Sequence, residues 1–105
     1  MIDMNLIVLY PQPENPDKFE SDYSSHIKLL HEKMEIPLDQ KPYTLTKFYS
    51  GPGGKPPYYQ MFTMPFKSAE ELEEALSSPA MQEVAADANR ISSGGAPTIL
   101  MGKSS

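Results

Sequence analysis

Short apolar runs and longer stretches with helical spacing alternate along the chain, and they predict its secondary structure. The run MNLIVLY (Met4–Tyr10) is dense and is followed by prolines, so it predicts a strand buried on both faces. The runs YTLTKFYS (Tyr43–Ser50) and YYQMFTMPF (Tyr58–Phe66) are rich in aromatic and β-favouring residues and predict two more strands. The run PTILMG (Pro97–Gly102) predicts a last strand, with its proline at the start, where the missing N–H is tolerated.

The stretch after the first strand predicts a long helix. Asn15 can cap its N-terminus, and Pro16 suits the first helical position, where its missing N–H costs nothing. We expect the helix to end near Glu35 or Ile36, because Pro37 disfavours helical geometry in the residue before it.

Two shorter helices are predicted between the third and the last strand. The sequence SAEE (Ser68–Glu71) is a capping box that opens one helix, and Ser78-Pro79 ends it and starts the next. The order is β-α-β-β-α-β, which predicts an α+β, ferredoxin-like fold: a four-stranded antiparallel sheet with its helices on one face. The length of 105 residues suits one domain over residues 1–105, with a frayed tail from about residue 102.

Both faces of the predicted strands are apolar. In the third strand, one face carries Tyr58, Phe62, Met64 and Phe66, and the other carries Tyr59 and Met61. A sheet covered by helices on one side only should have polar residues on its open face. The chain has no spare element to cover that face, so we expect a homodimer in which two sheets pack face to face.

The long helix carries both histidines of the chain. At about 100° per residue, an arc of roughly 80° holds five apolar residues: Phe19, Tyr23, Ile27, Leu30 and Met34. His26 lies about 20° outside this arc and is predicted to face the interior, whereas His31 lies about 40° past the other edge and is predicted to face water.

Tyr23 and His26 are three residues apart on one helical face, so their side chains can approach each other. Together they offer a phenol and an imidazole with an intrinsic pKa of about 6.5. Beside an apolar interior, such a pair can move protons on a small hydrophobic molecule. The alternative is a histidine hydrogen-bonded within the core, with Tyr23 as packing, and the residues alone leave both interpretations open.

Other kinds of site fit the sequence poorly. The segment GPGGK (residues 51–55) lacks the spacing of a phosphate-binding loop and joins two strands, so we expect a hairpin loop that can act as a flap over a pocket. His26 and His31 point about 140° apart on a helix, and no cysteine is present, so no metal site is predicted. A single histidine can ligate a haem iron, but no other feature indicates haem, and we expect no cofactor.

Composition restricts the class of partner. A formal net charge of −5 and a pI near 4.9 argue against a nucleic-acid partner, because no basic stripe is present to meet phosphates. The absence of cysteine excludes a disulfide framework and a thiolate nucleophile. The run LIVLY is too short for a signal-peptide core, and no run approaches the roughly 20 apolar residues of a membrane span. We therefore expect a soluble, cytoplasmic protein.

Two long segments of the chain resemble the EthD-like family, which is named for ethyl tert-butyl ether degradation. They are LIVLYPQPENPDKFESDYSSHIKLL and PPYYQMFTMPFKSAEELEEALSSPAMQEVAADANRISSGG. The most specific element is matched by Asn15, Pro16, Phe19, Glu20, Tyr23 and His26. The chain departs from the family pattern at Asn15, where the family has Asp, and at Lys28, where it has Pro. A helix that continues past His26 changes the shape of any pocket mouth there.

The resemblance implies a dimeric α+β barrel and a link to the breakdown of ethers and other xenobiotics beside an oxygenase system. With the residues above, it suggests a small metal-independent enzyme that oxidises, isomerises or decarboxylates a small hydrophobic oxygenated molecule. His26 and Tyr23 would be catalytic, and Tyr59, Phe19 and Phe66 would bind the substrate. The alternative is a non-catalytic accessory protein that carries a hydrophobic ligand for a partner oxygenase.

Overall fold

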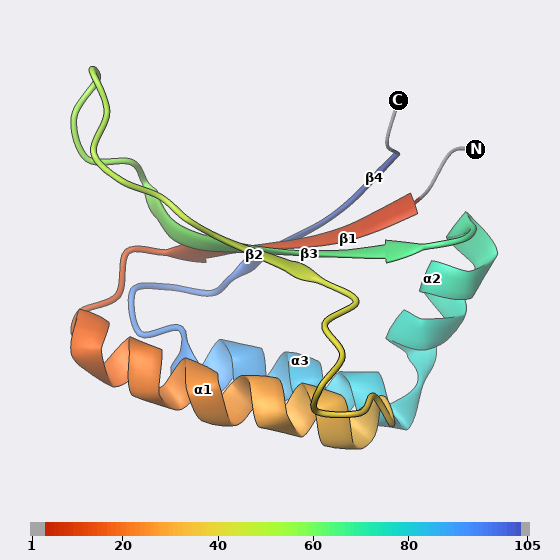
Figure 1. Ribbon diagram of the computed structural model, residues 1–105. Helices are drawn as coiled ribbons and strands as arrows, with labels where there is room; N and C mark the ends of the chain where they lie inside the picture. The colour runs from red at the N-terminus through yellow and green to blue at the C-terminus, as the bar shows by residue number, and fades with distance from the viewer. Residues whose placement is uncertain (1–3, 104–105) are drawn as a thin grey trace.

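Four strands and three helices follow one another in the computed structural model, which describes residues 4–103 (Figure 1). In chain order they are β1 (Met4–Pro11), α1 (Pro16–Lys33), β2 (Thr44–Lys47), β3 (Tyr58–Phe66), α2 (Ala69–Ser77), α3 (Pro79–Ile91) and β4 (Thr98–Lys103). The strands form one antiparallel sheet in the order β2-β3-β1-β4. The predicted α+β, ferredoxin-like fold is confirmed.

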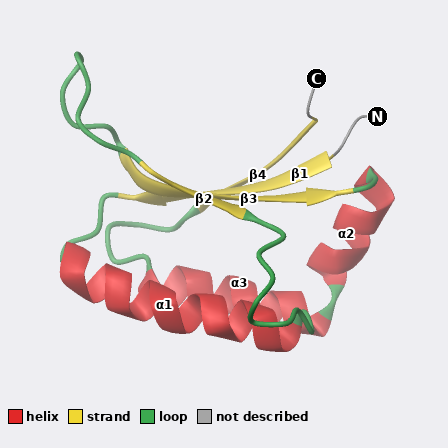
Figure 2. Cartoon of the chain, viewed as in Figure 1, coloured by secondary structure: helices red, strands yellow, loops and turns green. Residues whose placement is uncertain are grey.

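The helices lie on one face of the sheet, as predicted (Figure 2). α1 and α3 run side by side beneath the strands, and α2 connects the end of β3 to the helical layer. The register pairs Val8 of β1 with Phe62 of β3 and with Ile99 of β4, and these side chains face the helices. The core lies between the two layers.

The local signals at the start of α1 act as predicted, but the helix ends earlier. The Asn15 side chain accepts a hydrogen bond from the Lys18 N–H at 3.2 Å, and Pro16 occupies the first helical position. The helix ends at Lys33 because Glu35 adopts a left-handed φ of 55°. The Ile36 N–H then donates to the His31 carbonyl at 2.9 Å, which closes the helix in a Schellman-type cap.

Serines fix the boundaries of α2 and α3. The Ser68 hydroxyl accepts from the Glu71 N–H at 3.1 Å, while the Glu71 carboxylate accepts from the N–H of Lys67 rather than that of Ser68. Ser78 follows α2, and its hydroxyl accepts from the Met81 N–H at 3.2 Å to cap α3. The predicted capping and the predicted break between the helices are confirmed.

A glycine fixes the C-terminal end of α3 against the chain that enters α1. A Cβ on Gly94 would lie 1.8 Å from the carbonyl oxygen of Gln12, so only glycine fits there. The Ser93 hydroxyl accepts a hydrogen bond from the Glu14 N–H at 3.1 Å beside it. This close contact sets α3 next to α1, and the candidate site lies between these two helices.

The outer face of the sheet is apolar over its central strands. The register places Leu9 opposite Met61 and Ile7 opposite Leu100 on the face away from the helices. Within residues 4–103, no helix or loop covers these side chains, as the view along the sheet shows (Figure 1). Tyr59 departs from the predicted alternation, because its ring packs edge-on against Phe19 of α1 at 5.4 Å.

Two predicted segments differ in the structure. β2 ends at Lys47, and the hairpin that follows projects beyond the sheet, away from the helices (Figure 1). Gly51 and Gly54 bridge it by two backbone hydrogen bonds of 3.0 and 3.1 Å. The predicted flap over a pocket is therefore wrong. Gly102 and Lys103 pair with β1 as part of β4 instead of fraying, and residues 104–105 of the predicted tail lie outside the described residues.

Candidate functional site

His26 faces the interior from the middle of α1, as predicted, and it is 5% exposed. Its Nδ1 lies 2.9 Å from Oδ2 of Asp87 on α3. An ionised carboxylate can only accept a hydrogen bond, so Nδ1 carries the proton and donates it. This leaves Nε2 of His26 unprotonated, with a free electron pair.

Asp87 is held on its other side by Arg90. Oδ1 of Asp87 lies 2.8 Å from Nε of Arg90, one turn further along α3. Burial alone raises the pKa of Asp87, but the hydrogen bonds from His26 and Arg90 outweigh it, and the net pKa lies below the usual value. Asp87 therefore stays ionised and orients the imidazole.

Asp87 was missed by the sequence analysis. It lies three residues after Val84 and four before Ile91, at the spacing of the apolar stripe of α3. An acidic residue at this spacing is a usable signal, because a carboxylate on a buried helix face needs a partner.

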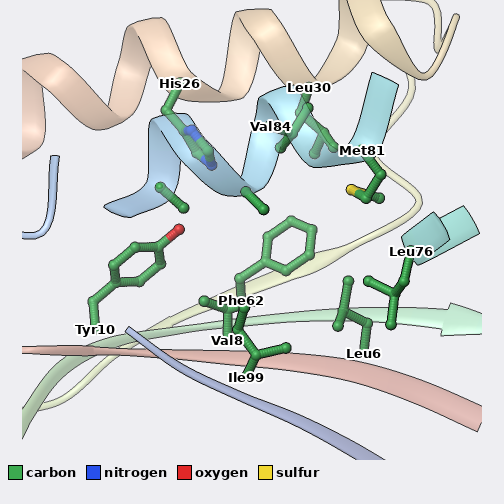
Figure 3. A pocket seen from close by; sticks show the side chains of 12 residues that line it. Leu6, Val8, Tyr10, His26, Leu30, Phe62, Leu76, Met81, Val84 and Ile99 are labelled. Atoms are coloured by element: carbon green, nitrogen blue, oxygen red, sulfur yellow. The ribbon is translucent and has the colours of Figure 1, made fainter. Parts of the chain in front are cut away.

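His26 forms part of the wall of a cavity of about 50 Å³ between the sheet and the helices α1 and α3 (Figure 3). The wall is almost wholly apolar, and among the lining side chains those of His26 and Tyr10 contain nitrogen or oxygen. The cavity opens past Leu76 and Ile99, which are partly exposed. The lining residues are Leu6, Val8, Tyr10, His26, Leu30, Phe62, Leu76, Met81, Val84, Ala85, Ala88 and Ile99.

The environment of His26 favours the neutral imidazole. Burial has the largest effect and lowers the pKa of His26, the Asp87 carboxylate raises it, and the positive charge of Arg90 lowers it; the net pKa lies below the ordinary value. A neutral imidazole with a free Nε2 at neutral pH is a general base.

Tyr10, on β1, is the second polar residue of the cavity and was not predicted as a site residue. Its hydroxyl points from the sheet toward His26 (Figure 3). Burial, and then the negative charge of Asp87, raise the pKa of Tyr10 well above its usual value, so the hydroxyl stays protonated. The alternation of Leu6, Val8 and Tyr10 along β1 is the signal that places Tyr10 on the inner face.

Tyr23 approaches His26, as predicted, with ring centroids 5.5 Å apart. Its hydroxyl is buried and has no hydrogen-bond partner among residues 4–103, and the same holds for Nε2 of Gln60. Burial raises the pKa of Tyr23, with a smaller contribution from Tyr10. Tyr23 does not line the cavity, so its predicted catalytic role stays a prediction.

The three predicted substrate-binding residues lie away from the cavity. The Tyr59 hydroxyl donates to Oε2 of Glu20 at 2.6 Å, and this hydrogen bond raises the pKa of Tyr59 to about 12. Phe19 stacks on Tyr23, with ring centroids 5.6 Å apart, and Phe66 is buried at the other end of β3. None of the three lines the cavity, although the Phe19 ring packs edge-on against the Tyr10 ring at a centroid distance of 5.4 Å.

His31 contradicts the prediction that it faces water, because it is only 4% exposed. Its Nδ1 lies 3.2 Å from the carbonyl oxygens of Ile36 and Pro37, and its Nε2 lies 2.7 Å from the Tyr43 hydroxyl. The chain after α1 folds back over this side of the helix and buries it. His31 therefore has a structural role: it fastens the α1–β2 connection to α1.

Between residues 4 and 103, no group of three or more His, Asp or Glu side chains is arranged to hold a metal ion. None of the helices in that range is long and apolar enough to cross a membrane.

The sequence matches no family model. It is 32% identical over 89 residues to an uncharacterized 11.0 kDa protein of Rhodococcus erythropolis, encoded in the thcB-thcC intergenic region, and the match covers 84% of this chain and 82% of the relative. The chain belongs to the family of this protein. Its fold is that of an EthD family protein from Bacillus halodurans, with a TM-score of 0.82 and 24% identity over 98% of this chain and 99% of the other. The EthD-like assignment is thus confirmed for the fold.

Other solved structures share this fold at lower identity. A dimeric ferredoxin-like protein of unknown function from Jannaschia sp. has a TM-score of 0.67 at 12% identity, covering 96% of this chain and 97% of the other. The hydroxynitrile lyase of Passiflora edulis has a TM-score of 0.68 at 12% identity, covering 99% and 94%. The cofactor-independent oxygenase SnoaB of Streptomyces nogalater has a TM-score of 0.57 at 12% identity, covering 99% and 91%.

Proposed function

We propose that this EthD-like protein is a small enzyme that uses general acid/base chemistry on a small hydrophobic oxygenated molecule, without a metal ion. The observation that carries the proposal is the His26–Asp87 pair at the wall of an apolar cavity. His26 is the base, and Asp87 orients it and stabilises the imidazolium that forms when Nε2 takes a proton.

A general base of this kind suits a substrate that is already reactive. A positioned general base contributes typically about 10²- to 10⁴-fold to a rate. Oxidation, isomerisation and decarboxylation of an activated molecule all begin with, or depend on, such a proton transfer. Two proteins of the same fold, a hydroxynitrile lyase and a cofactor-independent oxygenase, are named as enzymes, which supports a catalytic role here.

The second candidate is an accessory protein that binds a small hydrophobic ligand and performs no chemistry. The almost wholly apolar wall of the cavity favours it, because apolar burial alone holds such a ligand. The two candidates differ in one observable: an enzyme releases a changed molecule, and a carrier releases the same one.

Deprotonation of nitroethane tests the base directly, because this molecule is small, neutral and acidic at carbon. The nitronate that forms is measured by its ultraviolet absorbance, with buffer alone as the reference. We expect His26→Leu to lower the rate by about 10²-fold or more, and His31→Leu, scored per folded molecule below its melting temperature, to keep the wild-type rate. Equal rates for wild type and His26→Leu overturn the proposal. Binding of nitroethane without His26-dependent turnover favours the accessory protein.

We also propose that the chain forms a homodimer through the outer face of its sheet. The apolar side chains of Ile7, Leu9, Met61 and Leu100 on that face have no cover within residues 4–103. A protein of the same fold is described as dimeric, which supports this assembly. An obligate interface of this kind buries well over about 1,000 Å² in total.

A further inference from the structure

The Tyr10 hydroxyl is a buried polar group in the wall of the apolar cavity. Tyr10 is only 1% exposed. The ring packs edge-on against Phe19 and Tyr23, at centroid distances of 5.4 and 5.5 Å, so the phenol is held firmly. A phenylalanine would make the same ring contacts without burying a hydroxyl. Packing of the ring therefore does not explain why this position carries a tyrosine.

The position of this hydroxyl gives that explanation. It points into the cavity from the sheet, while His26 points into the same cavity from α1 (Figure 3). The cavity thus has a hydrogen-bond donor on one wall and, at Nε2 of His26, a proton acceptor on the other. All other lining side chains are hydrocarbon or thioether.

We propose that the cavity binds a neutral enolisable carbonyl compound, with its carbonyl oxygen on the Tyr10 hydroxyl and a neighbouring C–H bond facing Nε2 of His26. This inference rests on the proposed function and names its substrate class and a second catalytic residue. A donor for the oxygen and a base for the carbon, placed on opposite walls, are the two groups that enolisation needs.

The reaction balances without any further reagent. Nε2 of His26 takes the proton from the carbon, and the electron pair of that C–H bond forms a carbon–carbon double bond. The carbonyl π pair moves onto the oxygen, where the Tyr10 O–H stabilises the developing negative charge or transfers its proton. Return of a proton to the same carbon gives exchange with solvent. If the substrate has a further carbon–carbon double bond next to that carbon, the product of the first step is a dienol, and return of the proton to its far carbon gives an isomer.

Charge and size restrict the substrate further. The lining carries no cationic side chain to hold a carboxylate or a phosphate, and the Asp87 carboxylate lies directly behind His26. An anion is therefore disfavoured, and a neutral ketone, aldehyde, ester or lactone fits better. The cavity volume of about 50 Å³ takes the reacting carbonyl group, while a larger remainder of the molecule would extend past Leu76 and Ile99.

Hydrogen–deuterium exchange of butanone tests this inference. The protein is incubated with butanone in D₂O, and the loss of the proton signals next to the carbonyl is followed by NMR against a buffer control. We expect wild type to catalyse the exchange and Tyr10→Phe to lose about 10²-fold or more of that rate, as for loss of an oxyanion donor. Tyr43→Phe is the matched control, because it removes the hydroxyl of a buried tyrosine that does not line the cavity, and per folded molecule it should exchange butanone at the wild-type rate.

A second readout separates the hydroxyl from the packing. With butanone labelled with ¹³C at the carbonyl, the bound carbonyl signal should move downfield in wild type and stay near its free position in Tyr10→Phe. Butanone exchange at equal rates in wild type and Tyr10→Phe overturns the inference. So does a wild type that deprotonates nitroethane through His26 but does not exchange butanone, and in that case the proposed function stands. Loss of His26 dependence in both reactions overturns the two together.

Discussion

Nδ1 of His26 on α1 lies 2.9 Å from Oδ2 of Asp87 on α3, and this contact joins the two helices beside the cavity. The carboxylate is fixed from its other side by Arg90, so the imidazole is held in one orientation and one tautomer. The geometry is that of a base with its orienting acid, built across a helix–helix contact.

Asp87→Asn should weaken the base while leaving the fold in place. The amide can still accept the Nδ1–H, but it has no charge to stabilise the imidazolium, so we expect nitroethane deprotonation to fall by about 10-fold or more. The matched control is Asp22→Asn, which removes a carboxylate of α1 that pairs with Lys18 at the surface. Asp22→Asn should keep the wild-type rate, and an equal loss in both variants would show that Asp87 has no specific role.

The rate of nitroethane deprotonation should fall as the pH is lowered, with a midpoint below pH 6.5. This is below the ordinary histidine value because burial lowers the pKa of His26. Only the neutral imidazole accepts a proton, so the rate is at its plateau at pH 7 and above. Nitroethane deprotonation between pH 4.5 and 8 measures the midpoint, after correction for the buffer reaction. A midpoint above 7 would contradict the assignment.

The lowered pKa of His26 also predicts how the free energy of unfolding depends on pH. Since the pKa of His26 is lower in the folded than in the unfolded chain, the unfolded state binds a proton first as the pH falls. The stabilisation that comes from the neutral His26 is fully present above pH 6.5, and it is lost as the pH falls through the pKa that His26 has in the folded protein. Urea unfolding at pH 7.5 and at pH 5 should show this loss in wild type, and His26→Leu should reduce it.

His31 and Tyr43 should matter for stability and not for chemistry. His31→Leu leaves the Tyr43 hydroxyl and two backbone carbonyls without their partner, so we expect a loss of about 2 kcal/mol in the free energy of unfolding. Tyr43→Phe removes one of these hydrogen bonds and should cost about 1 kcal/mol. Because both changes remove the same hydrogen bond, the double variant should lose less than the sum. Additive losses would mean that the contact at 2.7 Å does not hold in solution.

The outer sheet face and the inner face should respond differently to a charge. Met61→Lys places a lysine on the face proposed as the dimer interface, and Phe62→Lys places one in the core. Analytical ultracentrifugation should show a dimer for wild type and a folded monomer for Met61→Lys, whereas Phe62→Lys should unfold the chain. A wild-type monomer at micromolar concentration would contradict the proposed assembly.

The elements of this fold could be predicted from the sequence because their signals are local. Asn15-Pro16 and Ser78-Pro79 mark helix starts by capping and by the missing proline N–H, and these effects do not depend on the rest of the chain. The helical arc placed His26 correctly, since the neighbouring helix α3 buries the face that the arc defines.

The site could be predicted only in part because it is made by tertiary contacts. His31 was placed on the wrong side because a helical arc takes no account of the segment after α1, which folds back over that side and brings Tyr43 to the imidazole. Asp87 and Tyr10 lie far from His26 in the sequence, and only the packing of α1 on α3 and on the sheet brings them together. The cavity is the small space that the side chains between the sheet and the helices leave unfilled, and no pattern in the sequence predicts such a space.

The tautomer of His26, measured by ¹⁵N NMR of histidine-labelled protein at pH 7, shows whether this side chain is poised as a base. We expect a neutral imidazole with its proton on Nδ1, bonded to Asp87, and an unprotonated Nε2 whose resonance moves when butanone or nitroethane is added. The signals of His31, which does not line the cavity, should stay unchanged in the same titration. A charged imidazolium at pH 7, or a proton on Nε2 of His26 with no response to either probe, would show that His26 is not the base of this cavity.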